Sequence, residues 1–400
     1  MSTSTISAGA PPPTSSPRQP PSPLRPRDFR PADLGLLLLC AASSLALVWV
    51  VFYQLTLLSG AFGFLVVWYA CFLLLYWVAT SQVVDRMAAT DRVVTVVVVT
   101  GAVVILGLLV YVIAWVSAKA IPHLDFHLFT RDQKFFEIVG PNALSSVGVA
   151  HAIVGTLEQV GFAALLGVPV AVATAVFLNE VGGRGTRLIR TVVTAMSGTP
   201  SVIAGVFIYS ILIINHVLGY SGFAAALALF VLLLPLVTRT TEEVLRVVPS
   251  GLREASLALG APEWRTVWSV VLPTARSGVI TAVLLGVARA AGETAPLLFT
   301  AFGSQVMNPN VFSHPQSALP LEVWTNVRQA EPVLITLAFE AAFVLLVLVL
   351  ILFVAARVLG RTRARSSAGR RRGRSPDISS VFDRALVPLW RDTPTEGERT

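Results

Sequence analysis

The chain of 400 residues is strongly hydrophobic and basic, with 54% hydrophobic residues, 13% charged residues, a formal net charge of +8 and a mean hydropathy of +0.74. This composition excludes an ordinary soluble globular domain. Apolar runs of about 20 residues, the length at which a helix crosses a bilayer, recur along the chain. The predicted fold class is therefore all-α, as a polytopic membrane protein.

The two ends of the chain have a different composition from the rest. Residues 1–30 are rich in Pro and Ser and lack the apolar core of a signal peptide, and residues 359–400 combine the basic run 370–372 with an acidic end. Neither end can bury a core, so both are predicted to be disordered. We interpret the basic run as a solvated tail beside anionic membrane lipid, and no nucleic acid is expected as a partner.

Eight membrane spans are predicted between these ends. Their bounds are 34–57, 61–80, 93–117, 150–178, 191–214, 222–238, 278–300 and 333–356. The first two would form a hairpin within residues 31–85, where Cys40 and Cys71 are expected as apolar thiols and not as a disulfide. The third span opens a segment over residues 93–149, and the other five belong to a core over residues 150–358. The role of the hairpin is not evident from its residues.

The distribution of Lys and Arg predicts the orientation of these spans. Both termini and one set of loops carry most of the basic residues, among them Arg86, Arg92, Arg184, Arg187, Arg190, Arg239, Arg246, Arg253, Arg265 and Arg276. The opposite set holds Lys119, Arg131, Lys134 and Arg328. Because cytoplasmic loops carry an excess of Lys and Arg, both termini are predicted to be cytoplasmic. The long loops 118–149 and 302–332 then face outward, where a soluble partner would dock.

A helix break is predicted in span 191–214, at Ser197-Gly198-Thr199-Pro200-Ser201. Pro200 removes a backbone donor and obstructs the preceding turn. If the helix restarts there, it presents free backbone N–H groups as an anion site, to which Thr199 and Ser201 would add hydroxyl donors. The alternative is an ordinary proline kink in which the hydroxyls bond back to the backbone.

A partly charged insert, predicted over residues 240–276, separates two apolar spans on the basic side. Glu254-Ala255-Ser256-Leu257-Ala258-Leu259 suits a helix, and Gly260 supplies a positive-φ stop. Pro262 fits the first turn of a second helix that carries Trp264 and Trp268. The sequence predicts a helix–turn–helix across the cytoplasmic face for docking a soluble partner; the alternative is an interfacial amphipathic helix without a partner.

The last charged motif is Ala288-Arg289-Ala290-Ala291-Gly292-Glu293-Thr294-Ala295-Pro296, within span 278–300. Arg289 is predicted near the middle of the membrane, where an unpaired cation is costly, and Glu293 on the same helical face. This pair is either structural, pinning helices together, or part of a substrate path. A guanidinium can offset part of the desolvation of an oxyanion through bidentate bonds.

Two further acids lie in predicted spans, Glu158 and Glu340. Their context assigns them no role, although Glu340 is a candidate to pair with a partner subunit. No P-loop is present, so this chain is not expected to hydrolyse ATP. No nucleophile–base pair or His/Cys cluster is evident, so no catalytic residue, metal or cofactor is predicted.

These motifs together resemble one family. The string from Glu254 to Pro273, in which Glu254, Ala255, Gly260, Leu272 and Pro273 match and Ser256 and Val270 depart mildly, resembles the "EAA loop" of ABC importer permeases. Residues 289–296 resemble the signature "RxxGETAP" of phosphate permeases of the PstA type, and residues 198–201 resemble their "GxPS" element. Residues 152–157 and 177–180 resemble their "AIxGTL" and "YLxE" elements, with Phe177 in place of Tyr. The resemblance covers roughly residues 95–358.

This resemblance to PstA-type permeases, which are binding-protein-dependent transport system inner-membrane components of a CysTW-like subfamily, implies a type I ABC-importer fold with six core spans plus the N-terminal hairpin. It implies ATP-driven import of inorganic phosphate across the cell membrane, with Arg289, Glu293, Thr294, Thr199 and Ser201 along the substrate path. The implied partners are a PstC-like permease, two ATPase subunits of PstB type and a phosphate-binding protein of PstS type. Two alternatives stay open: another oxyanion such as molybdate or sulfate, and a membrane scaffold or sensor without transport. A third rival, a channel or ion-coupled carrier that works without ATP, is disfavoured by the presence of the insert at 254–273.

Overall fold

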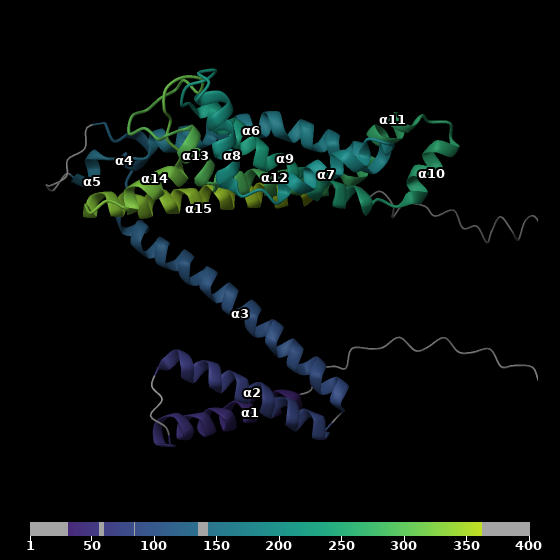
Figure 1. The fold of residues 1–400 in the computed structure, drawn as a ribbon, viewed down its shortest axis with the longest axis vertical. Helices are drawn as coiled ribbons and strands as arrows, with labels where there is room; N and C mark the ends of the chain where they lie inside the picture. Colours follow the sequence, from purple (N-terminus) through teal and green to yellow (C-terminus); the bar gives the residue numbers. More distant parts are fainter. Residues whose placement is uncertain (1–30, 56–59, 84, 135–142, 362–400) are drawn as a thin grey trace, which may run out of the picture. The chain divides into compact units, whose positions relative to one another are not determined.

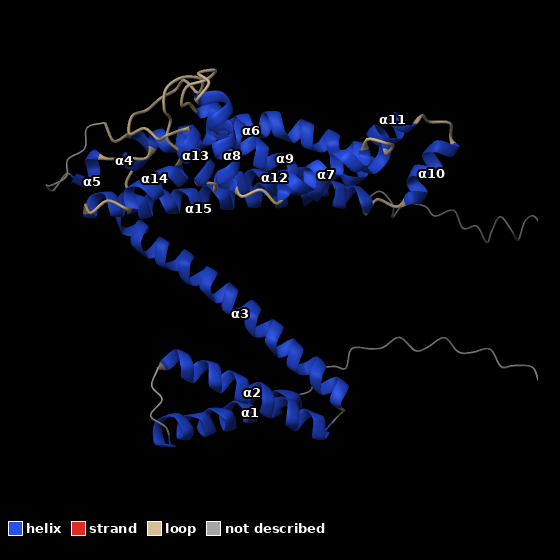
Figure 2. Ribbon diagram, in the orientation of Figure 1, coloured by secondary structure: helices blue, strands red, loops and turns tan. Residues whose placement is uncertain are grey.

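The computed structural model describes residues 31–361, apart from residues 56–59, 84 and 135–142. Every named element in this part of the chain is a helix, as Figure 2 shows. The predicted all-α fold class is therefore confirmed. Of the ends predicted to be disordered, residues 1–30 and 362–400 lie outside the described residues, and the final helix extends to Arg361.

The chain forms two compact units, Met1–Val110 and Tyr111–Thr400. In the first unit, α1 (Pro31–Val50) runs into a π-helical turn (Val51–Leu55) and packs against α2 (Ala61–Val83). Buried Cys40, Phe72 and Tyr76 form the centre of this contact. The long helix α3 (Arg86–Ala120) begins in the first unit, where Arg92 pairs with Asp33 at 2.8 Å, and ends in the second.

Long helices pack side by side as a bundle in the second unit (Figure 1). They are α6 (Ala150–Val176, continued by the π-helical η3, Phe177–Val181), α9 (Gly222–Arg246), α12 (Leu272–Ala291) and α15 (Pro332–Arg361). Helix α9 packs on both α6 and α12, and α12 also packs on α15.

Shorter helices complete the bundle. They are η2 (Ile121–His123), α4 (His127–Thr130), α5 (Ala143–Ser146), α7 (Thr186–Ser197), α8 (Ser201–Ile208), η4 (Tyr209–Ile213), α10 (Ser250–Ala258), α11 (Glu263–Thr266), η5 (Val267–Val271), α13 (Ala295–Thr300) and α14 (Leu319–Val327). In Figure 1, α10 and α11 lie at one end of the bundle, and α4 and α5 at the other.

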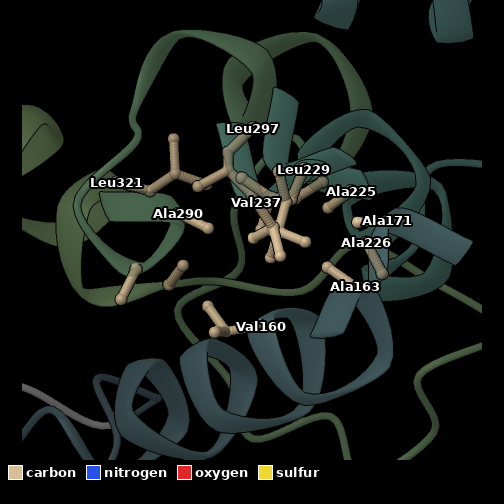
Figure 3. Packing of buried hydrophobic residues seen from close by; sticks show 14 residues of the cluster. Val160, Ala163, Ala171, Ala225, Ala226, Leu229, Val237, Ala290, Leu297 and Leu321 are labelled. Carbon is tan, nitrogen blue, oxygen red and sulfur yellow. The ribbon is translucent and has the colours of Figure 1, made fainter. Parts of the chain in front are cut away.

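Small residues allow the long helices to approach closely. The largest buried cluster, shown in Figure 3, gathers Ala163 and Ala171 of α6, Ala225 and Ala226 of α9 and Ala290 of α12 around a few larger apolar side chains. Such small residues are typical of helix interfaces inside membranes, where close backbone contact replaces the hydrophobic effect. The core therefore rests on backbone proximity as much as on side-chain volume.

The described residues contain seven helices that are long and apolar enough to cross a membrane, and the bent pair formed by 186–197 and 201–213 raises the number to eight. These helices fall in the eight predicted regions, which confirms a multi-pass membrane protein. Several predicted boundaries are wrong. The third helix begins at Arg86 instead of residue 93, and α9 continues to Arg246 instead of ending at residue 238. In place of the span predicted at 278–300, a longer helical run begins at Glu263 and ends at Ala291.

Candidate functional site

The predicted break in the fifth span is present. Helix α7 ends at Ser197, α8 begins at Ser201, and the two axes form an angle of 104°. Pro200 precedes α8 with ψ at 141°, an extended conformation that ends the helical path. The Thr199 hydroxyl donates to the Ala195 carbonyl at 3.2 Å, and Ser197 bonds back to Val193 at 2.8 Å. The structure therefore combines features of both interpretations: the helix breaks fully, and the Thr199 hydroxyl bonds back to the backbone.

The restart at α8 leaves backbone donors available. The first intrahelical bond from this end runs from the Ile203 N–H to the Pro200 carbonyl at 3.0 Å. Pro200 has no side-chain group with which to cap the helix, and half-buried Ser201 is the first helical residue. The N–H groups of Ser201 and Val202 thus stand at a helix N-terminus, the arrangement that binds anions in many proteins.

A second break replaces the continuous helix predicted over 278–300. Helix α12 ends at Ala291, Gly292 caps it, and the Glu293 N–H closes its last turn on the Ala290 carbonyl at 3.2 Å. The short α13 then starts at Ala295, with Pro296 in its first turn, where a missing N–H costs nothing. Gly292 and Pro296 together stop one helix and start the next. Arg289 accordingly lies in the last turn of α12, not in the middle of a span.

Arg289 and Glu293 form a loose ion pair across this second break. Arg289 Nε lies 3.7 Å from Glu293 Oε1, which is beyond hydrogen-bonding distance. The Arg289 side chain is 69% exposed, whereas that of Glu293 is 20% exposed. The guanidinium therefore keeps most of its donors available, and Thr294 beside it is half-buried.

The two breaks are joined by a contact between α8 and α13. An added Cβ at Gly205 would lie only 2.6 Å from Pro296 Cα, so the two backbones touch directly. Gly205 is one turn beyond Ser201, and Pro296 is two residues beyond Thr294. The helix that begins at Ser201 thus packs against the helix that begins inside the 289–296 motif.

The predicted helix and turn of the insert are also present. Helix α10 carries Glu254 and Ala255, both exposed, and ends at a turn where Gly260 has φ at 79°. Gly260 donates to Leu257 and Ala261 to Ser256, so the last carbonyls of α10 are satisfied within the turn.

The second helix of the insert is not separate, which corrects the prediction. Helix α11 passes through the π-helical η5 into α12, so that residues 263–291 form one span. Leu272 begins α12, and exposed Pro273 lies inside this continuous run. Pro273 has no N–H to donate to the preceding turn. The π-helical turn before it has a different hydrogen-bond pattern, so the helix continues past the proline.

Apolar side chains crowd the exposed tip of the insert. Leu259 is 89% exposed, and Trp264 and Trp268 are 67% and 69% exposed. Two large exposed aromatic rings and an exposed leucine in the insert present the composition of an interface core. The insert therefore offers a surface for another protein.

A buried carboxylate that the sequence did not point out organises the opposite end. Glu322 of α14 accepts hydrogen bonds from Gln133, from Asn326 at 2.7 Å and from Ser317 at 3.0 Å, and its Oε2 lies 3.3 Å from His151 Nε2. Burial raises the pKa of Glu322, but its contacts with His151, Gln133 and Ser317 outweigh burial and hold the pKa below its usual value. Glu322 connects the segment at Gln133 and the segment at Ser317 to the start of α6.

Glu158 and Glu340, the two further acids in predicted spans, have different surroundings. Half-buried Glu158 accepts a hydrogen bond from Gln316, which lies in the segment between α13 and α14. Glu340 of α15 is 2% exposed, and its Oε1 has no hydrogen-bond partner among the described residues. Glu158 therefore helps to hold the segment of Gln316 against α6. Glu340 is a buried acid to which the described contacts assign no role.

Comparison with known proteins establishes the family. Residues 167–365 match the model of the family described as "Binding-protein-dependent transport system inner membrane component". The "Phosphate transport system permease protein PstA 1" of Mycobacterium tuberculosis (strain CDC 1551 / Oshkosh) is 42% identical over 213 residues, which cover 53% of this chain and 70% of the relative. The chain belongs to the PstA family of binding-protein-dependent transport permeases.

Other members of the PstA family match over similar ranges. The PstA of Xylella fastidiosa (strain Temecula1 / ATCC 700964) is 36% identical over 244 residues, which cover 60% of this chain and 82% of the relative. A solved structure of the MetNI methionine ABC transporter in an inward-facing conformation is 23% identical, with a TM-score of 0.42, and the match covers 54% of this chain and 93% of that chain. The family predicted from the motifs is confirmed by the family model and by the PstA relatives. The region matched to the family model includes both helix breaks and the insert.

Proposed function

We propose that this PstA-family chain is one of two membrane subunits of an ATP-driven importer of inorganic phosphate. A PstC-like permease would form the other half of the path, two PstB-type ATPases would bind inside, and a PstS-type binding protein would deliver phosphate outside. The observation that carries this proposal is the loosely paired Arg289 at the end of α12. The next helix, α13, packs on α8, whose N-terminus has backbone donors available. The names of the PstA relatives support phosphate as the substrate.

The substrate path would run between the two breaks. Arg289 would meet two phosphate oxygens with its planar fork, and the α8 N-terminus with Ser201 would donate to the others. Glu293 would keep the guanidinium oriented and prevent phosphate from binding too tightly to leave. Thr294 would line the same segment, and Thr199 would contribute once its bond to Ala195 is exchanged.

The insert would couple ATP binding and hydrolysis by the ATPase subunits to movement of the membrane helices. Closure of the ATPases on ATP would move α10, which carries Glu254 and Ala255, while the turn at Gly260 holds its angle to α11. Because α11 continues through Leu272 and Pro273 into α12, this movement would reach the segment that bears Arg289. Such a rigid connection suits alternation between inward-open and outward-open states.

The orientation follows from charge. The insert lies on the Arg-rich side, and the Glu322 cluster lies among the loops that are poor in Arg. The positive-inside rule then puts the insert and both termini in the cytoplasm and leaves the outer loops free for the binding protein.

The test is phosphate uptake by the assembled transporter. Arg289→Lys keeps the charge but loses the fork, and losing one charge-assisted hydrogen bond predicts a reduction of uptake by about tenfold or more. A double variant, Arg289→Met with Glu293→Leu, separates the two interpretations of the pair, because a purely structural ion pair tolerates apolar replacement. Uptake near the wild-type rate in this double variant would end the proposal for the pair.

The same assay addresses the substrate class. Competition by sulfate and molybdate at concentrations that leave ATPase activity unchanged measures selectivity among oxyanions. Inhibition by unlabelled phosphate alone supports a phosphate importer, whereas stronger inhibition by molybdate or sulfate reassigns the machine to that oxyanion.

A further inference from the structure

One arginine fastens the insert to the bundle. Arg253 of α10 donates from Nε to Glu180 Oε2 at 2.9 Å and from Nη2 to Glu180 Oε1 at 2.8 Å. The Glu180 side chain is 7% exposed and that of Arg253 is 23% exposed, so the pair is largely protected from water. This parallel two-bond geometry is the strongest form of an Arg–carboxylate contact.

The same guanidinium also closes the end of α9. Arg253 Nη1 donates to the Val248 carbonyl at 2.8 Å, and Nη2 donates to the Leu245 carbonyl at 3.0 Å. Leu245 lies in the last turn of α9 and Val248 lies two residues beyond its end, so Arg253 adds a side-chain donor at this helix end, where the Val248 N–H already donates to the Leu245 carbonyl at 3.2 Å. Three elements meet at one side chain: α10, the end of α9 and the η3 end of α6.

The other contacts of α10 are weak. None of its residues is buried, and its apolar side chains Leu252 and Leu257 are 43% and 46% exposed. A hydrogen bond between the hydroxyls of Ser256 and Thr266, at 2.9 Å, ties it to α11. Without an apolar anchor, the position of α10 relative to α6 and α9 depends chiefly on Arg253.

A second ionic junction extends this connection. Glu242, near the end of α9, accepts from Arg190 of α7 at 2.7 Å and from Arg246 at 2.6 Å. Helix α7 leads directly to the break before α8. Arg253 therefore binds the end of α9, and α7 is bound to the same end of α9 through Glu242.

We propose that Arg253, through Glu180 and the end of α9, is the positioning residue that transmits movement of α10 into the bundle. This proposal rests on the proposed function, because it names the contact within this chain that would connect the ATPase-binding insert to the substrate path. A lysine at this position has no fork with which to hold Glu180 and two carbonyls at once. Its ammonium would leave some of these acceptors unsatisfied and let α10 move independently.

The first measurement concerns the clamp itself and needs no substrate. Amide hydrogen exchange of residues 250–258 in the detergent-purified complex is expected to accelerate about fivefold or more in Arg253→Lys. The matched control is Arg184→Lys, the same change at an exposed loop arginine that makes no hydrogen bond or ion pair within the described residues. Equal exchange in the wild type and Arg253→Lys would overturn the clamp.

The second measurement concerns transmission. In proteoliposomes that hold the full complex, Arg253→Lys is expected to retain the ATPase subunits and their ATP hydrolysis while phosphate uptake per ATP falls about fivefold or more. Wild-type coupling in this variant overturns the proposal. A wild-type complex that hydrolyses ATP but imports no phosphate contradicts the proposed function instead, and the exchange measurement then decides whether the clamp exists.

A double variant guards against loss of the fold. Arg253→Met with Glu180→Leu removes both charges together, a change that buried ion pairs often tolerate in stability. Because methionine cannot donate to the α9 carbonyls, this variant is expected to assemble normally and to remain uncoupled. An assembled double variant with wild-type uptake per ATP would assign the pair a purely structural role and overturn the proposal.

Discussion

The contact between α8 and α13 leaves no room for a side chain, so Gly205→Ala is expected to destabilise the second unit. The new Cβ would lie 2.6 Å from Pro296 Cα and 2.9 Å from the Pro296 carbonyl oxygen. Carbon atoms in contact normally lie about 3.5–4.0 Å apart, so the two helices must separate by about 1 Å. Backbone atoms on both sides cannot rotate away, and overpacking of this kind costs about 1–3 kcal/mol.

The control for this variant is Gly161→Ala, at an exposed position of α6 where nothing lies within 4 Å of the added Cβ. Both changes gain the same helix propensity, about 1 kcal/mol, so their difference isolates the clash. With about 2–4 °C per kcal/mol for units of this size, Gly205→Ala should melt about 2–12 °C below Gly161→Ala in detergent. Equal melting temperatures would refute the reasoning, because they would mean that the two breaks are not in rigid contact.

Two further predictions concern the ends of the bundle. With Cys40 and Cys71 removed, a single cysteine at Ser313 should react with an impermeant thiol reagent in intact cells and one at Glu263 should not; labelling at position 263 contradicts the orientation. Glu322→Gln should lower the melting temperature near neutral pH and abolish the extra loss of wild-type stability below about pH 4, where protonation of Glu322 removes the stabilisation that its lowered pKa provides. Melting curves recorded across this pH range check it, and a difference between the two proteins that does not change with pH speaks against the role of the charge.

The sequence predicts those parts of the structure that depend on near neighbours. Pro200 ends a helix through its own ring, and Gly260 stops one through its own positive φ, so both features were predictable. The apolar runs likewise located all eight membrane regions, because a span needs only length and composition.

The parts that were missed depend on partners far along the chain. Gln133 and His151 contact Glu322 across 189 and 171 residues, and Arg253 meets Glu180 across 73. The matching of the 177–180 segment to a family element pointed to Glu180, but nothing local indicated its partner. The end of α12 at Ala291 was missed because Gly292 and Pro296 lie inside an apolar run, where a glycine or a proline is often tolerated in a membrane helix.

The arginine–carboxylate pairs among the described residues of the second unit fall into two kinds, and the difference bears on function. The carboxylates of Glu180 and Glu242 are held at 2.6–2.9 Å by arginines at the insert end of the bundle. Arg289 instead lies 3.7 Å from its carboxylate and is 69% exposed. An arginine that must bind and release an anion repeatedly cannot be saturated by a permanent partner, because breaking a buried pair costs several kcal/mol. The tight pairs therefore suit transmission of movement, and the loose pair at the break suits contact with a passing oxyanion.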